Sequence, residues 1–375
     1  MKNKSFILPD FKHSNLNISA TLAEFLGVKS NNATLPILKK ALKKEYKNVV
    51  FICFDGMGVY PLTQNLEATD YLIRNITDTL VSTFPSTTAN ATTSLTTDTL
   101  PLEHGWFGWS VYFEKLHRNV NVFLNTDSWT NEELDVKDRS PLSNFDYYFD
   151  KSDINCKYAI NTVFPPFIKP KNPRRNTAFD NTEKFFDAIQ QICNKDGKQF
   201  VYAYNPEPDH SMHELGVTNP TVAAMLRDIS LRVKRLVDGT KDTLLIITAD
   251  HGQIDIEGYV ELYKDEYLYN MLEIYPYLEP RAIAFKVKES KKTEFENYFT
   301  NKYGQDFELH TSRELVERGF FGNVGNKAQL LGDYIAIGTY THKIALFTPD
   351  SMRFKGHHTS LTEEMQVPLI IIKSK

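Results

Sequence analysis

The sequence predicts an α/β protein built on a doubly wound, mostly parallel sheet that is flanked by helices. Two observations carry this prediction. Short apolar runs rich in β-branched and aromatic residues recur along the chain, as is typical of buried parallel strands. Between them, hydrophobic residues repeat at three- and four-residue spacing, as is typical of amphipathic helices. The expected buried parallel strands are residues 48–54, 200–204, 244–248 and 367–372.

The clearest helix is expected to begin at Pro220 and to end near Gly239. Proline suits the first turn of a helix because its missing N–H would have no partner there, and glycine suits the end. Arginine and lysine side chains occupy the opposite face from the apolar stripe. That stripe consists of Leu226, Ile229, Val233 and Leu236.

At 375 residues the chain exceeds a typical single domain. Two stretches break the alternation of strands and helices. Residues about 105–180 are rich in Trp, Tyr, Phe, Asn and Pro, and residues 266–340 suggest a small α+β unit. We expect both to be insertions that cap the active edge of a catalytic core formed by residues 1–265 and 341–375. Within the second insertion we expect a strand over residues 282–287 and a helix over residues 291–302.

The composition is that of a globular protein, with 41% hydrophobic and 24% charged residues. A net charge of −4 provides no basic field for a nucleic-acid polymer. The first residues contain no apolar stretch typical of a signal peptide, and no run approaches a membrane span. Cys53, Cys156 and Cys193 are scattered and odd in number, which argues against a disulfide framework. We therefore expect a cytoplasmic protein without a membrane partner; the oligomeric state stays open.

Acidic residues follow three of the expected strands. Asp55 and Asp250 come directly after theirs, and Asp209 lies in a short loop after another. Ligands of open α/β sheets bind at the carboxyl ends of the strands, so these carboxylates are expected to lie close together.

Histidines accompany the aspartates. His251 follows Asp250 directly, His213 lies four residues after Asp209 on one expected helical face, and one of His357 and His358 could complete a site. Each motif alone has a simpler explanation, such as a capping Asp or a polar surface turn. Together, three aspartates and three histidines make two mixed oxygen/nitrogen sites, a set that zinc favours and manganese tolerates.

A threonine-rich segment around Thr88 provides candidate nucleophiles. Pro85 ends a short strand-like stretch, and a helix can start just after it. A hydroxyl on the first turn of a helix meets free backbone N–H groups and the positive end of the dipole, where a phosphate binds. Several hydroxyls qualify on this argument, and a threonine-rich helix cap is the simpler alternative.

In order, these motifs resemble those of the alkaline phosphatase superfamily, in its branch of type I phosphodiesterases and nucleotide pyrophosphatases. The resemblance spans roughly residues 46–375 and selects Thr88 as the nucleophile. It also selects His358 over His357. The matching motifs are Asp55-Gly56 and residues 84–88, 101–105, 208–216, 250–252 and 356–358.

The resemblance implies two divalent metal ions, with zinc expected before manganese. Thr88 would attack phosphorus in line and form a covalent phospho-threonine, which a water on the second metal would release. The implied ligands are Asp55, Asp250, His251 and Thr88 for one ion and Asp209, His213 and His358 for the other.

One position departs from the family pattern. Nucleotide pyrophosphatases carry an Asn that donates to the phosphate where this chain has Trp109. Asn90 could replace that donor or face the core, so Asn90 and Trp109 are the candidate substrate-binding residues. Trp106, Phe107, Trp109 and Tyr112 could stack on a flat group, although we expect at least two of them to form the packed floor of a cap.

The expected function is therefore a metal-dependent phosphodiesterase or nucleotide pyrophosphatase acting on a small phosphate ester such as a nucleotide. A phosphomonoesterase or phosphonate hydrolase is the alternative, and Arg174 or Arg175 would then serve the extra charge of a monoester. A non-catalytic metal-binding module would require a missing nucleophile or ligand. A sulfatase is disfavoured, because no Cys/Ser-x-Pro-x-Arg motif occurs.

Overall fold

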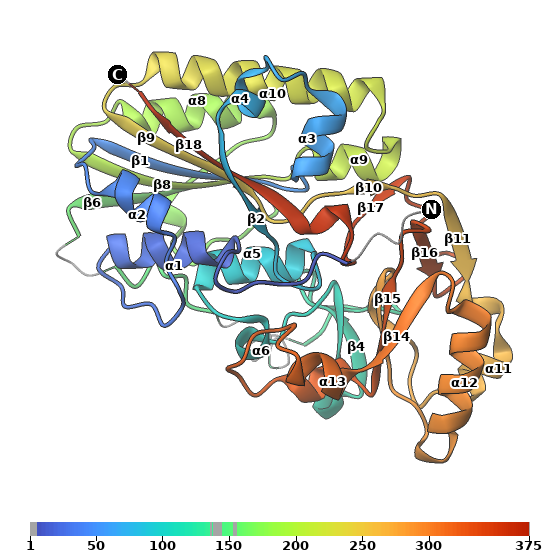
Figure 1. The fold of residues 1–375 in the computed structure, drawn as a ribbon. Helices are drawn as coiled ribbons and strands as arrows, with labels where there is room; N and C mark the ends of the chain where they lie inside the picture. Colours follow the sequence, from blue (N-terminus) through green and yellow to red (C-terminus); the bar gives the residue numbers. More distant parts are fainter. Residues whose placement is uncertain (1–5, 136, 138–144, 153–155, 375) are drawn as a thin grey trace.

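The computed structural model describes residues 6–135, 137, 145–152 and 156–374 and shows a large lobe and a smaller one (Figure 1). The large lobe is built on a seven-stranded sheet with helices on both faces, which confirms the expected fold class. The helices α8 (Thr182–Cys193) and α10 (Pro220–Gly239) lie on one face, and α1 (Leu16–Phe25) and α5 (Thr88–Thr97) on the other.

The strand β1 (Asn48–Phe54) runs through the middle of the main sheet, parallel to a neighbour on each side. All seven of its residues are buried, as its apolar composition predicts. The central position puts the residue after β1 between the ends of the two neighbouring strands. The order in the sheet is β2 (Ile76–Val81), β18 (Gln366–Lys373), β9 (Thr243–Ala249), β1, β8 (Lys198–Asn205), β6 (Tyr158–Phe164) and β7 (Asn176–Ala178).

The last strand corrects one expectation. Residues 367–372 do form a buried strand, but β18 runs antiparallel to both β9 and β2. The chain reaches β18 from the loop at the carboxyl edge of the parallel strands, so it must run back in the opposite direction. An apolar run indicates that a strand is buried but not in which direction the strand runs. The pattern of residues 367–372 therefore could not show that β18 is antiparallel to its neighbours.

The helix α10 follows its predicted bounds. The Asn219 side chain accepts a hydrogen bond from the Thr221 N–H, and Pro220 occupies the first helical position. Its apolar stripe is buried against the large lobe: Val222, Leu226, Ile229, Val233 and Leu236.

A second, antiparallel sheet forms the small lobe. It joins strands from residues 110–127 with strands from residues 277–338, since β3 and β12 are hydrogen-bonded neighbours. The two expected insertions thus share one sheet, whereas β6 and β7 belong to the main one. The order is β14 (Phe307–Thr311), β15 (Tyr334–Gly338), β13 (Ala282–Phe285), β12 (Tyr277–Glu279), β3 (Ser110–Phe113), β4 (Arg118–Asn121) and β5 (Thr126–Asp127).

The helix α12 (Lys292–Tyr303) covers part of this sheet, within one residue of its predicted bounds. Phe295 and Phe299 pack their rings against Phe285 of β13, at centroid distances of 5.2 and 5.3 Å. All three cysteines are free. Among the described residues no helix has both the length and the hydropathy needed to cross a membrane.

Candidate metal centre and nucleophile

Three buried aspartates meet at the carboxyl edge of the main sheet. Asp55 follows β1, Asp250 follows β9, and Asp209 begins the helix α9 (Asp209–Leu215) after β8. Because β1 lies between β9 and β8, their side chains converge on one place, where they are 3%, 0% and 8% exposed. Gly56 has φ +68, and a Cβ there would lie 2.9 Å from the Asp209 Cβ, so this close approach requires a glycine.

Asp55, Asp250 and His251 form one group whose ligand atoms lie within 4.8 Å of one another. His251 Nε2 is 3.3 Å from Asp55 Oδ1 and 3.5 Å from Asp250 Oδ2. The His251 Nδ1 faces the Gly252 carbonyl at 2.9 Å, which orients the ring with Nε2 toward the carboxylates. This group contains three of the four residues in the first ligand set that the resemblance implies, and the fourth is Thr88.

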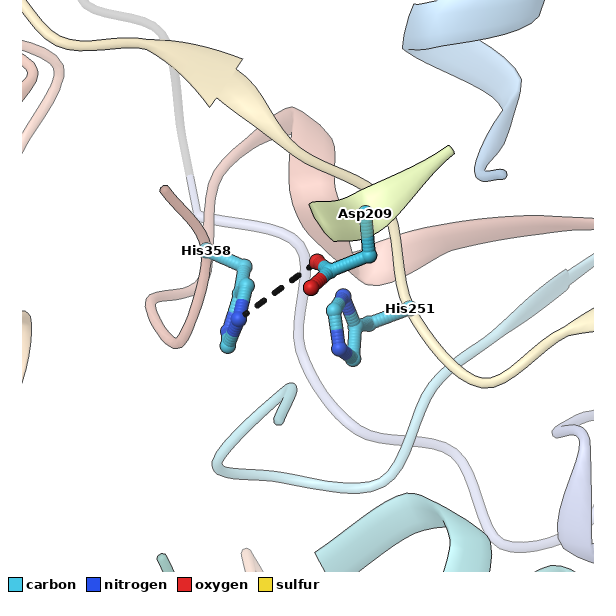
Figure 2. A group of neighbouring side chains, drawn as sticks. All are labelled: Asp209, His251 and His358. Carbon is cyan, nitrogen blue, oxygen red and sulfur yellow. Dashed lines mark ion pairs between the residues drawn. The ribbon is translucent and has the colours of Figure 1, made fainter. Parts of the chain in front are cut away.

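A second group consists of Asp209, His251 and His358. Figure 2 shows the Asp209 carboxylate facing both imidazole rings, with His358 Nε2 3.8 Å from Asp209 Oδ1. The ligand set expected from the sequence for the second ion differs at one position, where it has His213 and not His251. His213 lies beside this group: its Nε2 is 3.2 Å from Asp209 Oδ2, and its Nδ1 faces the Gly356 carbonyl. His357, the residue before His358, uses its Nδ1 to accept a hydrogen bond from the His358 backbone N–H.

The electrostatics of the cluster show the cost of gathering like charges away from water. Burial, reinforced by the neighbouring carboxylates, raises the pKa of Asp55 well above its usual range and that of Asp250 to about 7. Burial alone would also raise the pKa of Asp209, but His213, His251 and the Gln253 hydrogen bond together outweigh burial and lower that pKa. Despite burial, the Asp209 carboxylate raises the pKa of His213 to about 9.

The residues fit divalent cations. Asp250 Oδ2 is buried and accepts no hydrogen bond from the described residues, with His251 Nε2 3.5 Å away. A buried carboxylate oxygen without a hydrogen bond is costly, and a bound cation would both neutralise it and reverse the raised pKa values of its neighbours. The mixture of carboxylate oxygen and imidazole nitrogen suits zinc and is also compatible with manganese.

Thr88 lies on the first turn of α5, and its hydroxyl contacts this cluster. The preceding Thr87 is extended, with φ −139 and ψ 151, so the helix begins at Thr88 itself. The Thr88 hydroxyl lies 3.2 Å from Asp55 Oδ1 and 3.1 Å from His251 Nε2. The first hydrogen bond of the helix runs from the Ala91 N–H to the Thr87 carbonyl, so the N–H groups of residues 88–90 precede its ladder.

The two candidate substrate-binding residues lie in different environments. Asn90 is fully buried, and its amide donates to the Pro85 carbonyl at 2.9 Å. Trp109 has a 43% exposed side chain, while its backbone N–H donates to Glu279. Trp106 and Phe107 are buried in the small-lobe core. Of the two arginines considered for a monoester, Arg174 is exposed and Arg175 pairs with Asp150 at 3.4 Å.

No sequence motif indicated three residues that hold parts of the site: two of them contact the metal-ligand cluster, and the third contacts the segment before Thr88. The Tyr204 hydroxyl donates to Asp55 Oδ2, and the Gln253 amide donates to the Asp209 carboxylate. Both are polar groups beside a strand end, which is a signal that could have been used. Glu279 belongs to β12 of the small lobe, and nothing in its sequence surroundings points to the site.

Comparison with known proteins agrees with the fold and the motifs. Residues 49–320 match the family model described as type I phosphodiesterase/nucleotide pyrophosphatase. Murine ectonucleotide pyrophosphatase/phosphodiesterase 5 superposes with a TM-score of 0.64 at 16% identity, over 86% of this chain and 87% of that chain. An inactive variant of that murine protein, solved in complex with AMP, superposes with a TM-score of 0.62 at 16% identity, over 88% of each chain.

Phosphonoacetate hydrolase from Sinorhizobium meliloti, in complex with phosphonoformate, is similar to the same degree. Its TM-score is 0.64 at 15% identity, over 87% of this chain and 90% of that chain. At such identities the solved structures show the fold, whereas the family model, which covers more than half of the chain, shows the membership. The chain belongs to the type I phosphodiesterase/nucleotide pyrophosphatase family of the alkaline phosphatase superfamily, a family of metal-dependent hydrolases.

Proposed function

We propose that this protein is a two-metal phosphodiesterase or nucleotide pyrophosphatase whose nucleophile is Thr88. The observation that carries the proposal is the position of the Thr88 hydroxyl. It lies 3.1–3.4 Å from Asp55 and His251 at the start of a helix, above a buried cluster of carboxylates and imidazoles.

Asp55, Asp250 and His251 would hold one ion, and Asp209, His213 and His358 the other. When bound, the ions would supply positive charge to the phosphoryl group and lower the pKa of hydroxyls beside them. His213 belongs to the second set because its Nε2 shares the Asp209 carboxylate with that site.

The chain's own residues account for the remaining chemistry. The Thr88 oxygen forms a bond to phosphorus, its proton passes to a neighbouring base, and the bond from phosphorus to the leaving oxygen breaks. Asp55 Oδ1 lies 3.2 Å from the hydroxyl and can accept the proton, whereas the Nε2 of His251 would be occupied by the ion. Water then cleaves the phospho-threonine and restores the hydroxyl. The backbone N–H groups of residues 88–90 at the start of α5 are placed to receive non-bridging phosphoryl oxygens.

The residues around Trp109 determine which phosphate ester or phosphonate the site prefers. The backbone N–H of Trp109 already donates to Glu279, so it is not free to replace the asparagine of the family pattern, while the fully buried Asn90 amide uses one of its two N–H donors on the Pro85 carbonyl. The exposed Trp109 ring can instead pack on a flat leaving group. The AMP complex of the murine relative favours a nucleotide, and the phosphonoacetate hydrolase makes a phosphonate the alternative.

The test is a comparison of three substrates by purified protein with added zinc or manganese. These are a p-nitrophenyl ester of a nucleoside 5′-monophosphate, p-nitrophenyl phosphate and phosphonoacetate. Thr88→Ala should abolish turnover, and Thr88→Ser should retain part of it. Thr96→Ala is the matched control, because Thr96 lies on the same helix and its hydroxyl only donates to the helix backbone.

Enzyme that is acid-quenched during turnover of the nucleoside ester should carry one nucleoside monophosphate group on the peptide that contains residue 88, because only p-nitrophenolate leaves in the first step. Preference for the diester supports the phosphodiesterase, whereas preference for phosphonoacetate would assign the alternative. Full activity of Thr88→Ala would refute the nucleophile.

A further inference from the structure

A single carboxylate of the small lobe connects two segments of the candidate site. Glu279 lies on β12, and its side chain is 3% exposed. Its Oε1 accepts a hydrogen bond from the Thr87 hydroxyl and another from the Trp109 backbone N–H, each at 2.7 Å. The segment before the nucleophile and the segment that carries the exposed tryptophan therefore converge on one oxygen atom.

The bond to Thr87 bears directly on the nucleophile. Thr87 is the residue before the first helical position, and its carbonyl accepts the first hydrogen bond of α5, from Ala91. Its N–H donates to the Pro85 carbonyl at 2.9 Å. The backbone and the side chain of Thr87 are thus both hydrogen-bonded, and Thr88 follows directly as the first helical residue.

The bond to Trp109 is reinforced by close packing. A Cβ added at Gly108 would lie 3.1 Å from the Glu279 Cγ and 3.1 Å from the Leu278 backbone. Such a Cβ would lie closer than ordinary van der Waals contact allows. The backbone at Gly108 therefore lies directly against β12. The position of the Trp109 ring therefore depends on the same strand that holds Thr87.

Burying a glutamate between two segments costs free energy. Glu279 forms no ion pair with the described residues, and burial raises its pKa to about 7 although both hydrogen bonds oppose this. Acidic side chains are rarely fully buried without a partner, and an apolar residue would pack such an interface at lower cost. A specific geometric role is the physical reason to keep a carboxylate in this place.

We propose that Glu279 is a positioning residue of the reaction, which aligns Thr88 through Thr87 and fixes the Trp109 segment beside it. This assignment rests on the proposed function of Thr88. Among the described residues Glu279 forms no hydrogen bond or ion pair with Thr88 or with the candidate metal ligands, so the proposed effect passes through the two segments that it holds.

The experiment compares matched pairs of variants, all assayed with the same metal. Glu279→Ala removes the acceptor, while Glu279→Gln keeps the shape and one acceptor oxygen. Thr87→Val removes the donor, while Thr87→Ser keeps it. Misplacement of a nucleophile by about 1 Å can lower turnover by about 100-fold. We therefore expect Glu279→Ala and Thr87→Val to lower kcat by about 10- to 100-fold with KM and metal content close to wild type.

The conservative variants should recover most of this loss. In the double variant Glu279→Ala/Thr87→Val, the total loss of kcat should be much smaller than the product of the losses in the two single variants, because both changes remove the same interaction. A second readout does not depend on activity. In metal-free protein, hydrogen exchange of the peptide containing Trp109 should be faster in Glu279→Ala than in wild type and unchanged in Thr87→Val.

An unchanged kcat in both Glu279→Ala and Thr87→Val would overturn the positioning role, and so would a loss seen only in KM. Additive effects in the double variant would overturn it as well. If Glu279→Ala fails to fold, the Thr87 pair and Glu279→Gln still decide the question. An active Thr88→Ala variant would instead refute the proposed function and this assignment with it, whereas the exchange data would still report on the hydrogen bond.

Discussion

Replacing Asp250 by asparagine should stabilise the metal-free protein at alkaline pH. In the folded state the pKa of Asp250 is raised from 3.8 to about 7 by burial and by Asp209. Between these values the folded protein holds a proton that the unfolded chain releases. The free energy of unfolding therefore falls as the pH rises, by about 1.4 kcal/mol per unit and by about 4 kcal/mol once the pH exceeds 7.

Asparagine cannot ionise, so the variant escapes this penalty. The pKa of about 7 already includes the hydrogen bonds that the Asp250 Oδ1 accepts from the backbone N–H groups of Gly56 and His251, and an asparagine oxygen can accept the same two bonds. The expected gain is therefore up to about 4 kcal/mol at pH 8, which corresponds to a melting temperature several degrees higher. At pH 5, about one unit above the pKa of the unfolded chain, the advantage should shrink to about 1.6 kcal/mol.

The assay is thermal unfolding at a fixed scan rate, in chelator and in excess zinc, at pH 5 and pH 8. Zinc should raise the melting temperature of the wild type far more than that of Asp250→Asn, because the variant lacks a ligand. Asp98→Asn is the control. Asp98 lies at the far end of α5 with φ 57, a conformation that asparagine tolerates, and burial raises its pKa to about 6.

Asp98→Asn should therefore stabilise the protein at pH 8 equally with and without zinc. The reasoning is refuted if Asp250→Asn melts below the wild type at pH 8 in chelator. It is also refuted if the variant retains the full stabilisation by zinc.

Three further predictions concern neighbouring contacts. Tyr204→Phe removes the hydroxyl that orients Asp55 and should weaken metal binding by about 10-fold, measured by competition with a chromogenic chelator. Glu364→Gln leaves the fully buried Arg281 without its charged partner at 3.3 Å and should cost about 3 kcal/mol of stability, read from chemical denaturation. Trp109→Ala should raise KM for aromatic esters by about 3- to 10-fold while metal content stays unchanged, as steady-state kinetics and elemental analysis would show.

Much of the fold was predictable because it is local. The strand over residues 48–54 and the helix from Pro220 to Gly239 were predicted with the bounds that the structure has, since burial and amphipathic spacing act over a few residues. The motifs at the strand ends likewise named Asp55, Asp250 and His251, which the structure brings together. Parallel strands end at one edge, so a residue after each strand has few other places to go.

Other features depend on partners that are distant in the sequence. The pairing of β3 with β12 joins residues more than 150 positions apart, and no periodicity records it. The reversed direction of β18 follows from where the preceding loop lies, not from its apolar run. Among the candidate metal ligands, only the packed structure shows that His251 belongs to both groups.

The sequence by itself determined the α/β class, the family and the residue types that gather at the sheet edge. It did so because strands, helices and strand-end motifs are encoded within short windows. The tertiary structure alone decided that Glu279, from the other lobe, holds the segment before Thr88 and that the buried Asn90 amide donates to the Pro85 carbonyl. These contacts arise from hydrogen bonds between groups far apart in the chain, and a linear pattern contains no information about which distant donor a buried acceptor will meet.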